Sequence, residues 1–106
     1  MKILKYVLGA ILCVAVVSTA NADSAITRCG YLADLAEVIM TGRQQGVAAR
    51  EFLEFPNNPF PELIEEIVLD AYGNYNRVSS QAAQDSVVRE FSNDWYIMCL
   101  EVARGR

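Results

Sequence analysis

Two cysteines, Cys29 and Cys99, are the residues of this chain best suited to form a covalent bond. In an oxidising compartment an even number of cysteines indicates a disulfide, and two cysteines allow only one intramolecular pairing. A redox-active pair usually has Cys-x-x-Cys spacing, whereas about 70 residues separate this pair. We therefore predict a structural disulfide, which the chain-entropy relation values at roughly 4 kcal/mol. Intermolecular pairing is a third option.

The other residue types that commonly take part in catalysis or metal binding form no recognised active-site pattern in this sequence. The chain has no histidine, which removes the commonest general base, the Ser-His pair and the usual zinc ligand. Glu62, Glu65, Glu66 and Asp70 follow one helical side, but calcium sites draw oxygens from a loop and glycosidases need carboxylates across a cleft. No serine lies in a Gly-x-Ser-x-Gly motif. We expect a solvated acidic face, no catalytic residue, no metal, no cofactor and no enzyme activity.

The N-terminal segment predicts the oxidising compartment. Lys2 and Lys5 precede an apolar run over residues 6–17, and small residues follow it up to Ala22. A short basic region, a short apolar core and a terminal Ala-x-Ala are typical of a secretory signal peptide. The run is shorter than the ~20 residues that cross a bilayer.

We predict cleavage by the general secretory route between Ala22 and Asp23, with Ala20 and Ala22 as the recognised small residues. Residues 1–22 would then be a cleaved signal peptide, and residues 23–106 a single domain in the periplasm. An uncleaved anchor is the alternative if residues 18–25 enter the membrane as well. Cys13 follows Leu12 instead of a small residue, so we expect no lipid attachment and its loss with the peptide.

The charge of the mature chain limits its partners. Both lysines lie in the predicted signal peptide, so seven arginines stand against thirteen acids, a net charge of 7 − 13 = −6. A protein that binds nucleic acid or an anionic membrane surface needs clustered lysines and arginines to contact the negative charges. We therefore expect no nucleic-acid binding and no stable membrane anchoring after cleavage.

The remaining sequence predicts four helices. Apolar residues at steps of three and four predict a helix from Asp23 or Ser24 to a stop at Gly42. Gly30 inside it marks either a close helix–helix contact or slack in the helix. Three further helices are predicted, over residues 46–55, 61–73 and 80–104, with a proline-rich break at 56–61.

The cysteines then define how these elements are arranged. They lie near the start of the first mature helix and the end of the last, so they meet if those two helices run antiparallel. We predict an all-α fold, a compact bundle of about four helices. Its long C-terminal helix lies antiparallel to the first mature helix, and one disulfide staples the two together.

Exposed aromatic residues beside prolines can anchor a partner protein. Phe60 and Tyr75 lie in predicted loops and are therefore the aromatic residues expected to be exposed. Arg43, Arg50 and Arg77 could rim the same patch, because a guanidinium grips carboxylates better than an ammonium does. These five residues form the predicted partner-binding set.

The arrangement CGYLADLAEVIMTGRQQGVAAREF … AYG … C resembles a loosely defined group of small exported proteins of Gram-negative bacteria and their phages. Here Arg43-Gln44-Gln45-Gly46 and Ala71-Tyr72 carry the likeness, which covers most of residues 29–99. The resemblance implies a helical periplasmic protein and nothing about catalysis. Small helical immunity proteins against periplasm-acting toxins are similar in size, export and disulfide, but the chain has no motif diagnostic of them.

Three functional hypotheses follow. The first is a non-enzymatic periplasmic protein-binding module, such as an inhibitor or immunity protein against a basic envelope-acting toxin or hydrolase, because complementary charge speeds association. The second is an envelope-stress or chaperone-like structural protein. The third is a phage-derived regulator of lysis or superinfection with an uncleaved N-terminal anchor. Whether the protein forms a homo-oligomer is left open.

Overall fold

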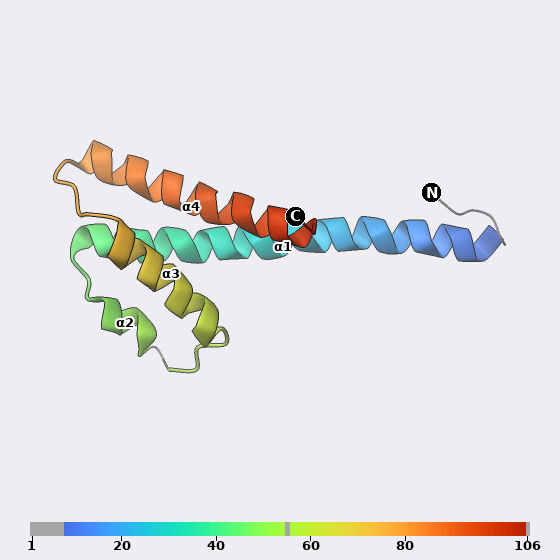
Figure 1. Cartoon of the computed structure of the whole chain (residues 1–106), viewed down its shortest axis with the longest axis horizontal. Coiled ribbons are helices and arrows are strands. Elements are labelled where there is room, and N and C mark those ends of the chain that lie inside the picture. Colours follow the sequence, from blue (N-terminus) through green and yellow to red (C-terminus); the bar gives the residue numbers. More distant parts are fainter. Residues whose placement is uncertain (1–7, 55, 106) are drawn as a thin grey trace.

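The computed structural model describes residues 8–54 and 56–105, with side chains from residue 24 onward, and these ranges contain helices and no strand. The all-α prediction is confirmed. Figure 1 shows two long helices side by side with a shorter helical hairpin against one end of the pair. The elements are α1 (Leu8–Gln45), α2 (Ala49–Leu53), α3 (Pro61–Asn74) and α4 (Gln81–Ala103).

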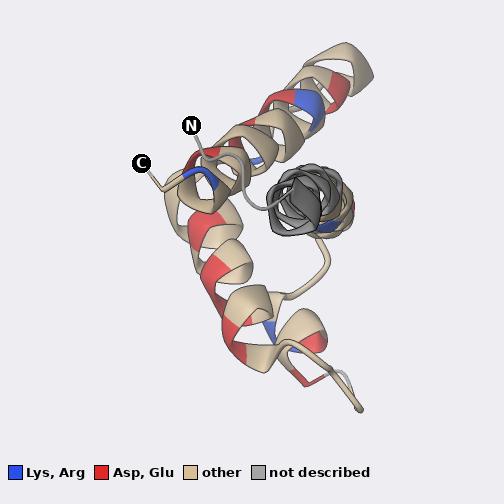
Figure 2. Ribbon diagram, turned by 90° about the vertical axis from the view of Figure 1, so that its right-hand side faces the viewer, with Lys and Arg blue, Asp and Glu red and all other residues tan. Residues whose placement is uncertain are grey.

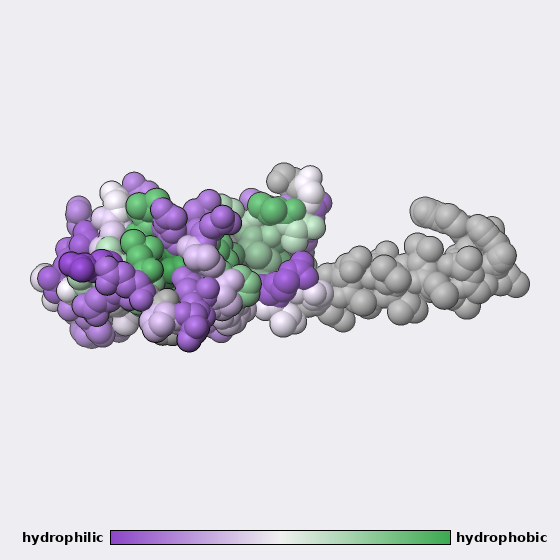
Figure 3. All heavy atoms as spheres, turned by 90° about the horizontal axis from the view of Figure 1, so that it is seen from below, coloured by the Kyte–Doolittle hydropathy of each residue, from purple (hydrophilic) through white to green (hydrophobic). Residues whose placement is uncertain are grey.

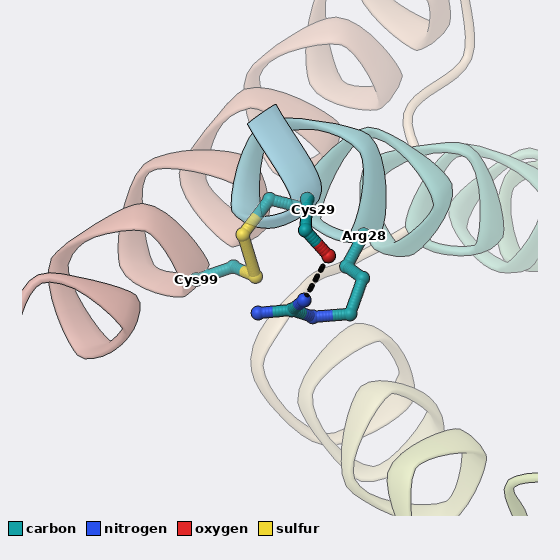
Figure 4. Close-up of a disulfide and its surroundings, with 4 residues drawn as sticks. Arg28, Cys29 and Cys99 are labelled. Carbon is teal, nitrogen blue, oxygen red and sulfur yellow. Dashed lines mark hydrogen bonds between the residues drawn. A yellow bond between two sulfur atoms is a disulfide. The ribbon is translucent and has the colours of Figure 1, made fainter. Parts of the chain in front are cut away.

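The antiparallel pairing of α1 and α4 is confirmed, because contacts join the two helices in opposite order along the chain. At one end Cys29 and Cys99 form a disulfide with their Cα atoms 5.5 Å apart. Figure 4 shows the bond bridging the two helices. Further along, Ser92 Oγ donates a hydrogen bond to the carbonyl of Ala33 at 2.9 Å. The disulfide therefore joins a point within α1 to the C-terminal part of α4.

The hydrophobic core lies where α3 packs against this helix pair. Each of the three helices contributes one stripe, and the largest fully buried side chain is Phe91 of α4. The core residues are Leu32, Ala36, Ile39 and Met40 of α1, Ile67, Val68 and Ala71 of α3, and Phe91 and Trp95 of α4. The three- and four-residue spacing also places Ile26 and Val102 on the core-facing sides of their helices, but both are exposed because they lie beyond the disulfide, outside the core.

The C-terminal end of α1 differs from the prediction. The helix passes Gly42 and stops at Gly46, whose φ of +87° lies in the left-handed region that glycine adopts without strain. The backbone N–H of Val47 donates to the carbonyl of Gly42 at 2.8 Å, and that of Gly46 to the carbonyl of Arg43 at 3.2 Å. This pair of bonds is the Schellman motif. The Arg-x-x-Gly sequence over residues 43–46 therefore ends the helix at Gly46, and not at Gly42 as predicted.

Gly42 instead allows close packing inside the helix. A Cβ atom there would lie 2.6 Å from Cζ of Phe52, so only glycine lets α2 approach α1 this closely. Gly30 has nothing within 4 Å of an added Cβ, so it does not mark a close helix contact. Within this one helix, Gly42 must therefore lack a side chain, whereas the position of Gly30 has room for one.

The start of α1 and the ends of α3 and α4 can also be compared with the predicted helix ends. The described backbone is helical from Leu8, so α1 begins before the predicted caps Asp23 and Ser24; no proline interrupts residues 8–45. The sequence offers Ser79 or Ser80 as the cap of the last helix, and it is Ser80 that caps α4, accepting a hydrogen bond from the backbone N–H of Ala83 at 3.1 Å. α3 extends one residue beyond Gly73.

The predicted signal peptide is only partly covered. Its basic region, Met1 to Lys5, lies outside the described residues, as do the side chains of Ala20, Ala22 and Asp23. In the part of the chain that was described, none of the helices has both the length and the apolar character needed to cross a membrane.

The contrast between the two helical glycines gives a stability prediction. We expect Gly30→Ala to raise the free energy of unfolding by about 0.5–1 kcal/mol, because alanine reduces the flexibility of the unfolded chain and meets open space. Gly42→Ala is the matched control, and we expect it to lower stability by displacing the Phe52 ring. Urea unfolding followed by circular dichroism measures both. A Gly42→Ala protein as stable as Gly30→Ala would contradict this packing argument.

The disulfide gives a second prediction. It spans a sequence separation of 70 residues, so we expect reduction with dithiothreitol to lower the free energy of unfolding by about 4 kcal/mol. The Cys29→Ala/Cys99→Ala variant should show a loss of at least this size, since Cys29 is also buried, and dithiothreitol should not affect it further. Equal urea midpoints for oxidised and reduced wild-type protein would refute loop closure as the source of stability.

Candidate partner-binding site

An apolar groove of about 280 Å³ opens between α1, α2 and the start of α3. Its walls come from three parts of the chain that are far apart in sequence. The apolar side chains that matter most are Tyr31, Leu35 and Val38 of α1, Phe52 of α2, Phe60 before α3 and Ile64 of α3. On the face in Figure 3, hydrophobic residues gather in patches bordered by hydrophilic ones. We call the groove lined by these six side chains the apolar groove.

Exposed apolar surface distinguishes this groove from the core. Val38 is 59% exposed, Tyr31 51% and Phe60 46%. The Tyr31 and Phe60 rings pack edge to face with centroids 6.0 Å apart, which holds both rings at the opening. Single exposed apolar residues are normal on a protein surface, but a contiguous set in a concavity is typical of a binding site.

The sequence of α1 explains one wall of the groove. Tyr31, Leu35 and Val38 follow each other at steps of four and three residues, so they lie on one helical face. This face is adjacent to the buried stripe that contacts α3 and α4. A second apolar stripe therefore runs beside the core stripe and is left partly uncovered by the short α2.

The proline-rich loop positions the opposite wall. Asn57 adopts a positive φ of 61°, and Asn58 Oδ1 accepts a hydrogen bond from the backbone N–H of Phe60 at 2.9 Å. Pro61 then begins α3, where its missing N–H costs nothing. These local constraints place Phe60 at the N-terminal end of α3, against Tyr31.

A second groove, of about 560 Å³, adjoins the first along α1. The two share Val38 and Phe52 in their walls, and Asp34 and Glu37 add carboxylates to the second one. Both acids are exposed. We call this feature the acidic groove. The outer face of α1 thus passes from apolar to acidic within one helical turn.

The predicted partner-binding set divides among three places. Phe60 is exposed, as predicted, and lies in the apolar groove. Tyr75 is half-buried instead of exposed, because its ring packs edge to face on Phe91 with centroids 5.1 Å apart. It follows the far end of α3, whose 14 residues span about 20 Å at the usual helical rise. The two aromatic residues therefore do not form one patch.

Two of the three arginines hold the fold together. Arg43 donates from Nε and Nη2 to the carbonyl of Tyr75 at 3.1 and 2.9 Å, and it lies over the Tyr72 ring at 5.2 Å from the centroid. Arg77 donates from Nε to the carbonyl of Gln44 at 3.2 Å. These bonds tie the α3–α4 loop to the C-terminal end of α1, where positive charge is favourable.

Gln44 completes this junction from inside. It is buried, its Oε1 accepts a bond from the backbone N–H of Val78 at 2.8 Å, and its Nε2 donates to the carbonyl of Asn76 at 3.0 Å. Burying an amide costs free energy unless it is hydrogen-bonded, and here both its ends are satisfied. We call Arg43, Gln44 and Arg77, with the loop carbonyls and amides they bind, the loop junction.

Arg50 stands apart from the loop junction. It is exposed on α2 and its Nε lies 3.4 Å from Glu54 Oε2, one helical turn away. Exposed ion pairs of this kind contribute less than about 1 kcal/mol. The three arginines therefore do not rim a common patch, and their binding role stays a prediction.

The two tyrosines near the loop junction have raised pKa values. Burial raises the pKa of Tyr72, with Arg43 acting against this and Glu51 with it. The Tyr72 hydroxyl donates to the carbonyl of Val47 at 2.6 Å. Burial also raises the pKa of Tyr75, followed by the charges of Asp70, Asp94 and Glu90. Both phenols are therefore protonated at neutral pH and serve packing and hydrogen bonding.

The acids of α3 lie along its outer side (Figure 2). Glu62, Glu65 and Glu66 are exposed. Asp70 is half-buried, and it accepts hydrogen bonds from Trp95 Nε1 at 3.1 Å and from Asn74 Nδ2 at 2.8 Å. Asp70 therefore links α3 to α4. No three side chains of metal-binding type gather among the residues that the structure describes.

A polar cleft of about 630 Å³ lies between α1 and α4, and it shares Glu37, Thr41 and Gln45 with the acidic groove. Several of its polar groups already hold the fold together. Gln44 belongs to the loop junction, Gln84 Nε2 donates to the carbonyl of Val78 at 2.9 Å, and Ser92 bonds α1. These three side chains therefore serve the fold.

Comparison with known proteins returned no match among family models, curated proteins or solved structures. Sequence reasoning found Phe60 but missed Tyr31, Leu35 and Val38, because only the core stripe of α1 was read. Their four- and three-residue spacing was the signal that could have found them.

Proposed function

We propose that this chain is a non-enzymatic periplasmic protein-binding module. It acts as an inhibitor or immunity factor by occupying a basic envelope-acting toxin or hydrolase. The observation that carries the proposal is the apolar groove, where Tyr31, Val38 and Phe60 expose apolar surface on an acidic protein. Aromatic anchors in concave sites supply much of the binding energy in protein interfaces.

The charge of the chain supports a basic partner. The acids Glu51, Asp34 and Glu37 lie in or beside the apolar groove, and the mature sequence carries a net charge of −6 (7 − 13). Complementary charge accelerates association and suppresses wrong partners. The same charge disfavours nucleic acid and anionic membranes as partners.

The available side-chain chemistry supports binding in preference to catalysis. The chain has no histidine, and its mature cysteines are held in the disulfide. Asp70 and the two tyrosines of raised pKa have structural tasks within the fold. Exposed carboxylates on one face of a helix are suited to long-range attraction of a cationic protein.

A pull-down tests the binding role. The wild-type domain on beads should retain a periplasmic protein at low salt and release it as the salt concentration rises, since salt screens exposed charges. The Tyr31→Gln/Val38→Gln variant should lose most of this retention because it removes apolar surface from the groove.

The matched control is Leu69→Gln/Val102→Gln, which changes two residues that are 62% and 69% exposed and lie outside both grooves. We expect it to bind as the wild type does. If both double variants lose the partner equally, or if salt has no effect, the groove is not the binding surface.

Export has a separate test. The intact mass of protein from the periplasmic fraction should correspond to a chain that begins at Asp23. The Ala20→Leu/Ala22→Leu variant should accumulate with its leader attached, because signal peptidase requires small residues there. Ala25→Leu, beyond the predicted cut, should be processed normally. A full-length mass for the wild type would favour the anchored phage regulator instead.

A further inference from the structure

The apolar groove and the acidic groove are adjacent parts of one surface. Val38 and Phe52 line both, so a ligand chain that fills the apolar groove passes directly over the carboxylates of the acidic one. We propose that the two grooves together bind one segment of a partner protein. In this segment a large apolar side chain and a lysine or arginine lie within about one helical turn (~4 residues) of each other. This inference rests on the proposed function and specifies its partner.

The apolar groove accepts the uncharged anchor. Its volume of about 280 Å³ lies near the lower end of the range for ligand pockets, roughly 300–1,000 Å³. It therefore suits one side chain better than an extended apolar surface. The rings of Tyr31 and Phe60 stand edge to face at its opening. An aromatic or large aliphatic side chain would pack against this ring pair and against Leu35.

The acidic groove accepts the cation. Asp34 and Glu37 are three residues apart on α1, on neighbouring positions of one helical face. Among the described residues the one ion pair joins Arg50 to Glu54, so neither acid has a basic residue at ion-pair distance within that part of the chain. Arg89 of α4 lines the polar cleft together with Glu37, but the two form no ion pair. Two adjacent exposed carboxylates that no ion pair neutralises favour a cation from outside.

The register along α1 sets the spacing of the two anchors. Leu35 and Val38 in the apolar groove are each one residue after Asp34 and Glu37. The apolar and acidic contacts therefore lie at the same height along the helix, on adjoining faces. A partner segment needs no long span to reach both, which is why the two side chains must be close in its sequence.

The same geometry disfavours other occupants. An anionic lipid surface or an acidic segment would meet Asp34, Glu37 and Glu51 with like charge. A purely apolar segment would cover these carboxylates and remove them from water without compensation. The experiment below distinguishes a second copy of this chain, whose Val102 and Arg104 are both exposed near its C-terminus.

Selection from a random peptide library displayed on phage tests the proposal without knowing the partner. The wild-type protein, as purified from cells, is the bait, and peptides are selected at low salt. We expect the enriched sequences to pair an aromatic or large aliphatic residue with lysine or arginine within four positions.

Synthetic copies of the selected peptides then report on each groove. Tyr31→Gln/Val38→Gln and Asp34→Asn/Glu37→Gln should each weaken binding at least tenfold. The matched control Glu62→Gln/Glu65→Gln, which removes two exposed acids of α3 outside both grooves, should change it less than twofold. Added salt should weaken binding to the wild type more than to Asp34→Asn/Glu37→Gln. Circular dichroism confirms that each variant is folded.

Three results would overturn the proposal. The selection could enrich no peptide, or it could enrich peptides that contain no basic residue. The selected peptides could also bind the wild type and Asp34→Asn/Glu37→Gln with equal affinity. A wild-type dimer that Tyr31→Gln/Val38→Gln dissociates would assign the grooves to a second copy. A retained partner in the pull-down without the selected pattern would leave the proposed function standing and reject this inference. Selected peptides that show the pattern, without a retained partner in the pull-down, would leave the peptide preference of the grooves standing and reject the proposed function.

Discussion

The antiparallel contact between α1 and α4 is the constraint on which the rest of the structure depends. It is closed at one end by the Cys29–Cys99 disulfide and at the other by the loop junction, where Gln44 and Arg43 bind the α3–α4 loop. A covalent bond and a buried polar network thus clamp the same helix pair. A domain this small has little stability to spare, so fixing both ends of the pair lets the short α2 and α3 pack on a rigid surface.

The proposed binding function and core packing use adjacent faces of α1. One face supplies the core through Ala36, Ile39 and Met40, and the next supplies the apolar groove through Tyr31 and Val38. Gly42 connects the two roles, because its missing side chain admits the Phe52 ring that lines both grooves. A helix that was buried on both faces would be more stable but would leave no surface for a partner. The groove is thus a place where apolar area is kept out of the core.

Much of the fold could be predicted because local signals agreed with each other. Ser80 capped α4, Pro61 opened α3 and the cysteine positions implied an antiparallel pair, and the structure has all three. The stop at Gly42 was wrong because either glycine could end the helix locally. The choice depended on which one could adopt a positive φ and which one faced Phe52. The binding set was harder, because Arg43 and Arg77 are surface-type residues whose carbonyl partners lie more than thirty residues away.

The sequence by itself determined the helical class, the order of the elements, the acidic charge and the pairing of the cysteines. Each of these depends on residue type and on spacing along one chain. Only the tertiary structure decided which residues meet across elements. It buried Tyr75 on Phe91 and brought Phe60 to Tyr31, and it placed Asp34 and Glu37 beside an apolar groove. The physical reason is that a groove is formed by walls from separate helices, and their relative placement follows from packing that no local pattern encodes.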